Sequence, residues 1–381
     1  MDKNIDPRQQ AIREVVKDFA EKDIHPVSQE LDRASEPREF PKSLYEKLGA
    51  AGFIGMSLPK EFGGQGKSHL EYVTLIEELS YHDAAVGLLC AVGELAASSI
   101  LRFGDDKQKK RYVPDCITGG KVVAFVLTES ETGSDAAMLK TVAVDKGDHY
   151  LVSGEKIFIQ HGDVADIGVV FCKMENQSEP SALIVDDTGQ SGWQARTLKN
   201  KMGMRASTVG GIILKEVKVP KENVLGEPGR GASFAAEALD NARIVVAALS
   251  IGMAQRALDE SAAYAKARHA FGQPIAKLQA IQWMIADMAT RLAAGRAMVY
   301  DVARRQDAGE DYSIKGSMAR LFTAETANFC VDRAMQIHAG YGYIGEFSPI
   351  EKLYRDQRAL ELYEGSSEVQ QLVIADNVIG R

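Results

Sequence analysis

The stretch Val122–Asp135 reads VVAFVLTESETGSD, and the chain changes character where it begins. Downstream come further short runs rich in β-branched residues, separated by Gly, Asp and Ser: TVAVDKGDHYLVSG, KIFI, IGVVFCKM, SALIVD and IILKEVKVP. Such runs are typical of strands. Because no segment of helix length separates them, they predict an antiparallel barrel or sandwich and not βαβ units. This strand-rich block ends near Pro228.

Helical periodicity flanks the strand-rich block on both sides. Before it, apolar residues recur at helical spacing from about Asp6, and amphipathic segments cover 71–81, 84–103 and 106–118, with SLPKEFGGQG as a loop. After it, three longer helical segments cover 233–267, 278–307 and 312–339, and a shorter one covers 367–379. The sequence therefore predicts a mostly helical α+β protein with a helical domain at 1–120, a β-domain at 121–229 and a helical bundle at 230–381.

Composition describes an ordinary globular protein and excludes several classes. The 381 residues are 45% hydrophobic and 26% charged, and the net charge of −8 comes without a basic run, so we expect no nucleic-acid partner. Four cysteines, widely spaced and without a C-x-x-C pair, predict a reducing compartment and no metal site. The amino terminus resembles neither a signal nor a transit peptide, although a processed chain would look the same. We expect no transmembrane segment, since the apolar run Ile244–Ala254 is short.

A lone carboxylate stands out near the carboxyl terminus, in the stretch ELYEGSSEVQQ (Glu361–Gln371). Glu364 follows an apolar pair and precedes Gly365, which lets backbone approach a ligand, and Ser366 or Ser367 can start a helix. A carboxylate in this setting is either a functional base or an exposed loop acid. Local sequence favours the exposed acid, since most glutamates are solvated.

Four further motifs are ambiguous when taken singly. The glycines of GYGYIG (340–345) match a dinucleotide-binding pattern, but they follow a helix and not a strand, so we reject that interpretation and expect a turn with or without a ligand. TESETGSD (128–135) is either a turn or a loop whose amides face a cofactor. Asp240 and Arg243 form an ordinary helix pair. In RHAFGQPI, Arg268 suits a phosphate and Phe271 a ring, but a helix end uses the same residues.

Taken together, these motifs resemble one family. LTESETGSD, DNAR, ARHAFGQPI, QIHAGYGYIGEFSPIEKLYRDQR and LYEGSSEVQ, in this order and across nearly the whole chain, resemble the acyl-CoA dehydrogenase family of flavoproteins. The resemblance implies a helical amino-terminal domain, a middle β-domain and a carboxy-terminal four-helix bundle, the succession already read from periodicity.

The resemblance also implies a reaction. Glu364 would remove the α-proton of an acyl-CoA thioester while the β-hydrogen leaves as hydride to N5 of FAD, giving a 2-enoyl-CoA. The Glu364 backbone N–H and a flavin hydroxyl would stabilise charge on the thioester carbonyl. An electron-transfer flavoprotein would accept the electrons. The implied assembly is a homotetramer, located in the bacterial cytoplasm or, for a processed chain, in the mitochondrial matrix.

Residue roles follow from the resemblance position by position. The residues expected to bind FAD within one subunit are Val126, Leu127, Thr128, Ser134, Phe158, Gln160, Ser366 and Glu368. Those expected to hold the FAD of a neighbouring subunit are Arg268, Phe271, Gln336, Ile337 and Gly340. The expected substrate contacts are Ser134, Asp240, Arg243, Tyr363, Gly365 and Glu94.

Some positions depart from the family pattern. Gln160 and His161 stand where Thr and Asn are usual, so His161 would either tune the flavin or merely cap a strand. Ala242 stands where minority subgroups place the base, which leaves Glu364 as the sole candidate. Glu94 would read a polar or ring-shaped acyl group or be solvated, and Val86 disfavours a dicarboxylyl substrate. Two other functions stay open: an acyl-CoA oxidase and a non-catalytic binding or assembly protein.

Overall fold

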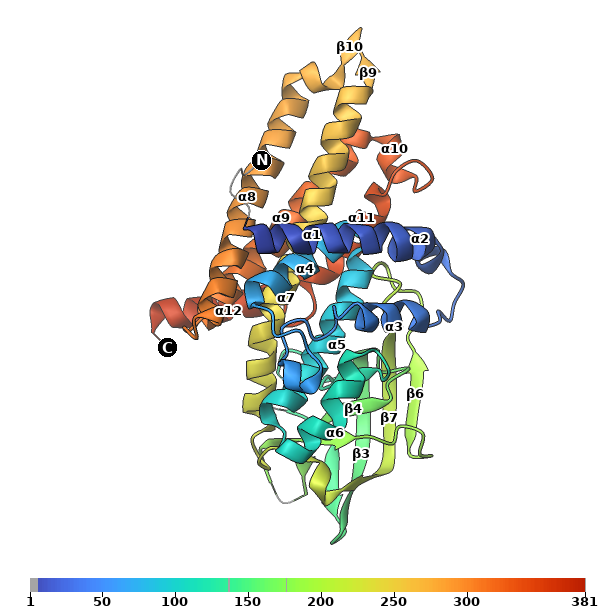
Figure 1. The fold of residues 1–381 in the computed structure, drawn as a ribbon, viewed down its shortest axis with the longest axis vertical. Helices are drawn as coiled ribbons and strands as arrows, with labels where there is room; N and C mark the ends of the chain where they lie inside the picture. Colours follow the sequence, from blue (N-terminus) through green and yellow to red (C-terminus); the bar gives the residue numbers. More distant parts are fainter. Residues whose placement is uncertain (1–5, 136–137, 176, 381) are drawn as a thin grey trace.

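A sheet lies at one end of the molecule and long helices at the other, with shorter helices between them (Figure 1). The computed structural model describes residues 6–135, 138–175 and 177–380. The longest helix, α7 (Gly231–Ala267), begins against β5 and runs the length of the molecule to a small hairpin. It thus connects the sheet to the far end of the bundle.

The amino-terminal helices begin at strong caps. α1 (Pro7–Phe19) starts with the Asp6 side chain and a proline, and one wider turn leads into α2 (His25–Arg33). α4 (His69–His82) and α6 (Asp106–Ile117) each open with a reciprocal capping box, from Ser68 and Asp105. α3 (Lys42–Ala50) and α5 (Ala84–Phe103) complete the group.

α5 is the most apolar of these helices. Among the described residues it is the one helix long and apolar enough to cross a membrane, and 89% of its most apolar window is buried inside the protein. Such burial is what a core helix shows. Sequence reasoning singled out Ile244–Ala254 as the longest apolar run, and that run lies inside α7.

The strand-rich block forms a single eight-stranded sheet in the order β6-β7-β3-β2-β4-β5-β8, with β1 also paired to β4. The bounds are β1 Val123–Val126, β2 Val142–Asp145, β3 His149–Gln160, β4 Ile167–Met174, β5 Pro180–Val185, β6 Trp193–Thr197, β7 Val209–Pro220 and β8 Val224–Leu225. The predicted β-domain is therefore present, as an open sheet and not a closed barrel.

Two of its pairings are parallel, which the expected antiparallel arrangement did not include. β1 pairs with the first half of β4 and β2 with the second half, both parallel to it. β1 and β2 thus run in the same direction along one neighbour, interrupted by the loop that contains TESETGSD. Periodicity within a strand gives its buried face and not the direction of its neighbour, so the sequence pattern did not reveal this.

The carboxy-terminal helices form the predicted bundle. α7 packs against α8 (Gln279–Asp307) and α9 (Ser313–His338), and α12 (Ser367–Ile379) packs on α9. A hairpin of β9 (His269–Ala270) and β10 (Gln273–Pro274) joins α7 to α8. α10 (Gly340–Tyr343) and α11 (Ile350–Gln357) follow α9. GYGYIG therefore follows a helix and forms a helical turn. A dinucleotide-binding motif would follow a strand, so the structure agrees with our rejection of that interpretation.

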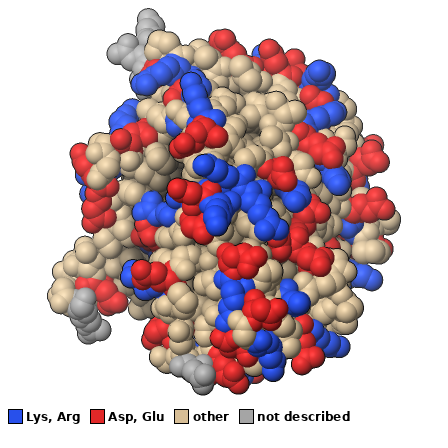
Figure 2. All heavy atoms as spheres, turned by 60° about the horizontal axis from the view of Figure 1, so that its bottom comes forward, with Lys and Arg blue, Asp and Glu red and all other residues tan. Residues whose placement is uncertain are grey.

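One hydrophobic core runs without a break from the amino-terminal helices into the bundle, because α7 packs on α4 and α5 as well as on α8 and α9. Two smaller cores lie on the two faces of the sheet. The seam between α5 and α7 is where the first core leaves space for a ligand. On the face shown in Figure 2, acidic and basic side chains are intermixed, with a group of Lys and Arg near the centre.

Candidate active site

Glu364 lies in a short turn between the helical turn Arg358–Glu361 and α12. Its backbone φ is 55° and that of Gly365 is 79°, so two consecutive residues adopt the left-handed region. Glycine adopts this conformation freely, whereas for a glutamate it costs about 1–3 kcal/mol. Strain of this kind persists only where the surrounding structure enforces it, and it concentrates at functional sites.

The turn is held at both of its flanking carbonyls. The Tyr363 carbonyl accepts a hydrogen bond of 2.8 Å from Arg320 Nη2, and the Gly365 carbonyl accepts one of 3.0 Å from Gln370 Nε2. A Cβ at Gly365 would lie 2.7 Å from that same Gln370 nitrogen. Glycine is therefore required both for the backbone conformation and for the close approach of Gln370.

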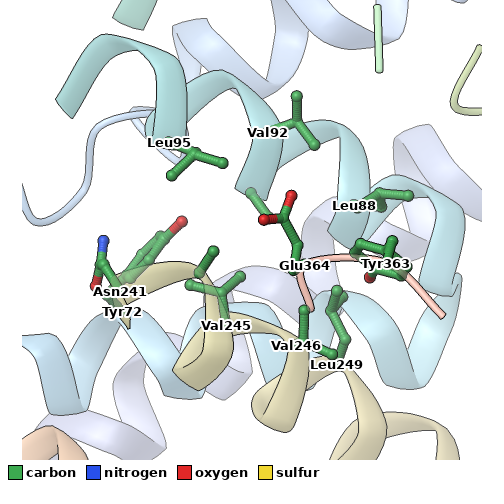
Figure 3. Close-up of a pocket in the computed structure, with 12 residues that line it drawn as sticks. Tyr72, Leu88, Val92, Leu95, Asn241, Val245, Val246, Leu249, Tyr363 and Glu364 are labelled. Atoms are coloured by element: carbon green, nitrogen blue, oxygen red, sulfur yellow. The ribbon is translucent and has the colours of Figure 1, made fainter. Parts of the chain in front are cut away.

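The Glu364 carboxylate points into a pocket between α5 and α7 (Figure 3). About 360 Å³ of space lies in this pocket and its opening together, part of it open to solvent. Tyr72 and Asn241 lie together at the end away from Tyr363. Tyr363 also lines the pocket, and the rest of the lining is aliphatic: Leu88, Ala91, Val92, Leu95, Ala242, Val245, Val246 and Leu249. This is the common composition of a small-molecule site, apolar with a few polar groups.

Burial raises the pKa of Glu364 to about 7, and the positive charge of Arg320 opposes that rise. Protein surrounds the carboxylate, although it keeps partial solvent access through the pocket opening. Among the described residues, none donates a hydrogen bond to this carboxylate. A carboxylate with a pKa near 7 and no donor is suited to accept or return a proton at neutral pH.

The Glu364 backbone N–H is also available. No carbonyl or side-chain acceptor among the described residues receives a hydrogen bond from it, whereas the N–H groups of Leu362 and Tyr363 both donate to Ala359. A free N–H beside a base is the donor needed for an oxyanion. The Glu364 N–H is therefore free to donate to a thioester carbonyl, as the resemblance implies.

The first group of expected flavin residues lies where β1 ends beside β3. The Thr128 carbonyl accepts a hydrogen bond of 3.0 Å from the Ile157 N–H, which places Thr128 next to Phe158. Val126 and Leu127 are buried, whereas Phe158 is 67% exposed and has a φ of 58°. A large aromatic ring held in a strained conformation and left uncovered fits a stacking partner such as an isoalloxazine ring.

His161 does not face this position. It is fully buried, lies edge-on to Phe40 and Tyr45, and contacts Ser207 Oγ at 3.3 Å through Nε2. Burial lowers its pKa to about 3, so it is neutral. These contacts favour the strand-end role over a flavin role. Gln160, partly exposed, accepts a hydrogen bond from Ser207.

A second pocket lies at the other end of the molecule, beside the hairpin and α10. Arg268, Ile337 and Gly340 line it, and the Arg268 guanidinium lies 5.7 Å from the centre of the Tyr341 ring. Phe271 is 91% exposed at the hairpin tip, and Gln336 is exposed nearby. Since the sheet and this hairpin are at opposite ends of Figure 1, one chain does not unite the two groups. That separation supports the prediction that this group serves a neighbouring subunit.

The remaining expected flavin contacts are accessible. Ser134 and Glu368 are exposed, and Ser366 is the N-cap of α12, where its Oγ accepts from the Val369 N–H at 3.4 Å. Ser366 therefore has a structural role in starting the helix that follows the base. Flavin contacts by all three stay predictions.

Asp240 and Arg243 form an ion pair of 2.6 Å on α7. The Arg243 side chain is largely buried and donates to Ser317 Oγ at 3.1 Å. In this arrangement it faces α9, so the expected contact of this pair with CoA stays a prediction.

Glu94 is near the Glu364 pocket along α5 but does not line it. Its carboxylate is 2.9 Å from the Gly55 N–H and 2.5 Å from Ser57 Oγ, both of which donate to it. Burial raises its pKa to about 7. The residue is buried and therefore not solvated, and it holds the loop 55–57 against α5. A contact with an acyl group stays a prediction.

Sequence reasoning missed three polar residues at the Glu364 site, namely Tyr72, Asn241 and Arg320. Arg320 is fully buried on α9. A single arginine within a stripe of small residues, with Gly316, Ser317 and Thr323 around it, was the available signal, because an arginine is rarely buried unless its environment binds it. Among the described residues no group of His, Cys, Asp or Glu side chains is arranged to hold a metal ion.

Comparison with known proteins places the whole chain in one family. The family models described as acyl-CoA dehydrogenase amino-terminal, middle and carboxy-terminal domains match residues 6–120, 124–217 and 229–379. Among relatives, a "3-(aryl)acrylate reductase" of Clostridium sporogenes is 42% identical over 97% of each chain. The "Caffeyl-CoA reductase-Etf complex subunit CarC" of Acetobacterium woodii is 41% identical over 96% of each.

Solved structures agree. Butyryl-CoA dehydrogenase from Megasphaera elsdenii has a TM-score of 0.94 at 33% identity and covers 100% of both chains. An acyl-CoA dehydrogenase complexed with FAD, from Bacillus anthracis, has a TM-score of 0.93 at 30% identity over 99% of this chain and 68% of that one. The exposed Phe158 beside Thr128, and the second pocket with Arg268 in a mainly apolar and aromatic lining, suit the same cofactor. The chain therefore belongs to the acyl-CoA dehydrogenase family and is an FAD-dependent oxidoreductase.

Proposed function

We propose that this protein interconverts a saturated acyl-CoA thioester and its 2-enoyl-CoA, with Glu364 exchanging the α-proton. The observation that carries the proposal is the Glu364 turn: a carboxylate with a pKa near 7, without a hydrogen-bond donor, directed into an aliphatic pocket. A non-catalytic protein needs no such base. An acyl-CoA oxidase needs the same base and differs only in passing its electrons to oxygen, so release of peroxide during turnover without an added acceptor distinguishes it.

In the dehydrogenation direction the α-C–H bond breaks and its proton passes to the Glu364 carboxylate. The β-C–H bond breaks with its electron pair, and the Cα–Cβ double bond forms. FAD, when bound, supplies the acceptor for that hydride. Atoms and charge balance because one proton and one hydride leave the saturated thioester.

The pocket supplies what this proton transfer needs. An α-proton of a thioester is only weakly acidic, so charge developing on the carbonyl oxygen must be stabilised by a fixed donor. The free Glu364 N–H is such a donor, next to the base itself. Leu88, Val92 and Val245 exclude water, which strengthens this contact and keeps the base in a low-dielectric surrounding.

Reduction of the double bond is the second candidate direction. Two relatives named above are called reductases, and a glutamate with a pKa near 7 is partly protonated at neutral pH, so it can return the α-proton. The direction that prevails then depends on the electron donor or acceptor. Aryl-substituted acyl groups belong on the substrate panel for the same reason.

We further propose an electron-transfer flavoprotein as the redox partner, a homotetramer as the assembly, and a cytoplasmic location in a bacterium. A relative described as part of an Etf complex supports the partner. The distance between the two groups of flavin residues within one chain supports the oligomer.

Replacing Glu364 by Gln tests the base. Glu364→Gln keeps the side-chain shape and should keep FAD, but turnover should fall by at least about a hundredfold because the proton acceptor is lost. Anaerobic change in flavin absorbance with straight, branched and aryl acyl-CoAs measures it. The matched control is Glu61→Gln, an exposed glutamate, which should behave as wild type. Near-normal turnover of Glu364→Gln would overturn the assignment.

A further inference from the structure

Arg320 is the largest side chain that the protein buries completely. It lies on α9, and its surroundings are the turn that carries Glu364 and the start of α12. Arginine is rarely buried without a partner, because removing a charge from water is costly. Its environment is therefore informative about what the charge does.

The Arg320 hydrogen bonds all go toward the base-bearing segment. Nη2 donates to the Tyr363 carbonyl at 2.8 Å, and Nη1 lies 3.5 Å from Ser367 Oγ. Nε is buried without a partner among the described residues. No carboxylate forms an ion pair within 4 Å of this guanidinium among the described residues. The fully buried guanidinium therefore has one firm hydrogen bond, to the Tyr363 carbonyl, and one long contact, to Ser367 Oγ.

The carbonyl that Arg320 holds belongs to the peptide immediately before Glu364. Since the Tyr363 carbonyl and the Glu364 N–H belong to the same peptide group, fixing one fixes the direction of the other. The Glu364 backbone is in the left-handed region and its N–H is free. One hydrogen bond therefore sets the orientation of both the strained turn and its oxyanion donor.

Resting on the proposed function, we propose that Arg320 is a positioning residue for Glu364: it fixes the peptide before the base and supplies a buried positive charge that favours the ionised carboxylate. The charge acts without an ion pair, across a low-dielectric interior. This explains why a costly buried cation is placed where no carboxylate neutralises it directly.

Arg320 is the one charged group that shifts the titration of Glu364, in the direction that lowers its pKa. α5 contributes aliphatic residues only to the lining of this pocket, and α4 contributes a phenol. The titratable or charged groups that face Arg320 and Glu364 come from α4, α7, the helical turn Arg358–Glu361, the Glu364 turn and α12. They are Tyr72, Asp240, Arg243, Glu361, Tyr363 and Glu368.

The test compares two substitutions that separate charge from hydrogen bonding. Arg320→Lys keeps the charge and one donor, whereas Arg320→Gln keeps a donor and removes the charge. The acid limb of the pH profile of kcat/KM for dehydrogenation should stay within a few tenths of a unit in Arg320→Lys. In Arg320→Gln it should move to higher pH by about one unit, so the rate at pH 6 falls about tenfold while the high-pH plateau is retained.

A second readout does not require turnover. The infrared band of the protonated Glu364 carboxyl, obtained as the difference between each protein and its Glu364→Gln counterpart, reports the titration directly. Its midpoint should follow the kinetic limb, higher in Arg320→Gln than in Arg320→Lys. Arg305→Met is the control, because Arg305 is a surface residue paired with Asp301 and Glu310. This substitution should shift neither the kinetic limb nor the infrared midpoint.

FAD content and thermal melting establish that each variant is folded. If Arg320→Gln does not fold, Arg320→Ala with guanidinium added to the buffer replaces it, and recovery of the wild-type midpoint supports the proposal. Equal titration midpoints in the wild type, Arg320→Lys and Arg320→Gln would overturn the proposal. A midpoint at lower pH in Arg320→Gln would also overturn it. Turnover by Glu364→Gln would instead overturn the proposed function, so the two failures are distinguishable.

Discussion

Glu364, which is partly exposed, and Glu94, which is buried, are two glutamates whose pKa values are raised to about 7 by the surrounding protein. The surroundings of the two carboxylates differ. Glu94 accepts hydrogen bonds from Gly55 and Ser57, whereas Glu364 faces a pocket. The Glu94 carboxylate already accepts two hydrogen bonds from the loop 55–57 and therefore holds that loop against α5. The Glu364 carboxylate is open to a cavity and is able to act on a ligand. Equal pKa values therefore do not mean equal roles.

Activity should depend on pH through Glu364. Dehydrogenation needs the ionised form, so kcat/KM should rise with pH and level off above about 7. Reduction needs the protonated form, so its kcat/KM should fall above about 7. Initial rates in both directions between pH 5.5 and 8.5 measure this. Profiles that are flat across this range would exclude Glu364 as the titrating group.

Stability should depend on pH through Glu94. Its pKa rises from 4.5 to about 7 on folding, so between these values the folded state holds a proton that the unfolded chain releases. The free energy of unfolding should therefore fall as pH rises from about 4.5 to 7, by at most about 3 kcal/mol. Urea unfolding of Glu94→Gln at pH 5 and 8 should show a smaller fall than its parent.

A Glu364→Gln background is the suitable parent for that comparison, because Glu364 contributes a pH dependence of the same sign. An identical loss of stability with and without Glu94 would show that this carboxyl is not protonated in the folded protein.

The contact between α4 and α7 joins the amino-terminal helices to the bundle through small residues. A Cβ at Gly252 of α7 would lie 2.1 Å from the Glu77 carbonyl, and Ser80 Oγ donates to the Leu249 carbonyl at 2.7 Å. The two backbones are thus close enough for a side chain to hydrogen-bond across. The pocket between α5 and α7 depends on this spacing, since α7 forms one wall of it.

Adding one methyl group should have opposite effects at two helical glycines. Gly252→Ala forces the α4 backbone away and should destabilise the protein by about 1–3 kcal/mol. Gly316→Ala on α9 meets only Ile244 at 3.8 Å and should stabilise by about 0.5–1 kcal/mol, because alanine is the better helix former. Thermal or urea unfolding compares the two. A neutral Gly252→Ala would show that α4 and α7 separate easily.

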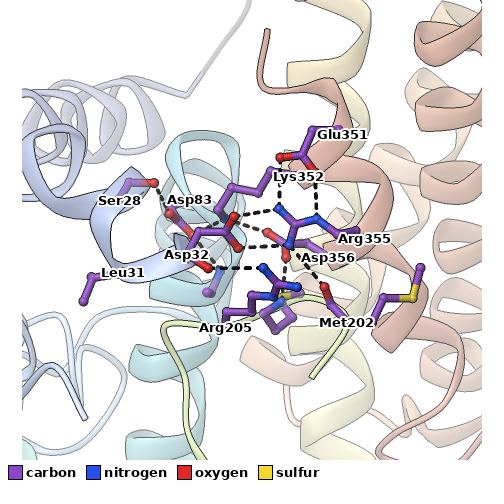
Figure 4. A network of polar contacts seen from close by, with 12 residues as sticks. Ser28, Leu31, Asp32, Asp83, Met202, Arg205, Glu351, Lys352, Arg355 and Asp356 are labelled. Atoms are coloured by element: carbon purple, nitrogen blue, oxygen red, sulfur yellow. Dashed lines mark hydrogen bonds and ion pairs between the residues drawn. The ribbon is translucent and has the colours of Figure 1, made fainter. Parts of the chain in front are cut away.

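A buried network of charges connects all three parts of the molecule (Figure 4). Lys352 of α11 pairs with Asp83, which caps α5, and with Asp356 at 2.6 Å. Asp356 also accepts a hydrogen bond of 2.6 Å from the Met204 N–H in the loop before β7. Arg355 forms a bidentate pair with Asp32 of α2. α11 leads directly into the Glu364 turn, so this network fixes the base relative to both other parts.

Lys352→Met should destabilise the protein by about 3–5 kcal/mol, because it leaves the buried carboxylates of Asp83 and Asp356 without their cation. Lys47→Met is the matched control: Lys47 pairs with Asp23 at the surface and its loss should change stability by less than about 1 kcal/mol. Urea unfolding with FAD bound measures both. Equal effects would mean that the network adds little beyond surface pairs.

The sequence predicted those helices well whose ends are set by residues close together in the chain. α5 and α12 have the predicted bounds, Ala84–Phe103 and Ser367–Ile379, because a cap and a helical period decide them. The direction of β1 and β2 along β4 was not predicted, because it depends on which strand lies alongside. Glu94 was expected to contact the acyl group or solvent, and only the folded loop 55–57 shows what it binds.

The sequence by itself determined the order of helical and strand-rich parts, the family, and Glu364 as the one candidate base. The order of the parts follows from side-chain chemistry and spacing along the chain, whereas the family and Glu364 as the base follow from the resemblance of the motifs to that family. Only the tertiary structure decided that the base lies in a strained turn, that α5 and α7 wall its pocket, and that Arg320, 44 positions earlier, holds the turn. Burial, electrostatic field and backbone strain arise between segments distant in sequence, so they exist only once the chain has folded.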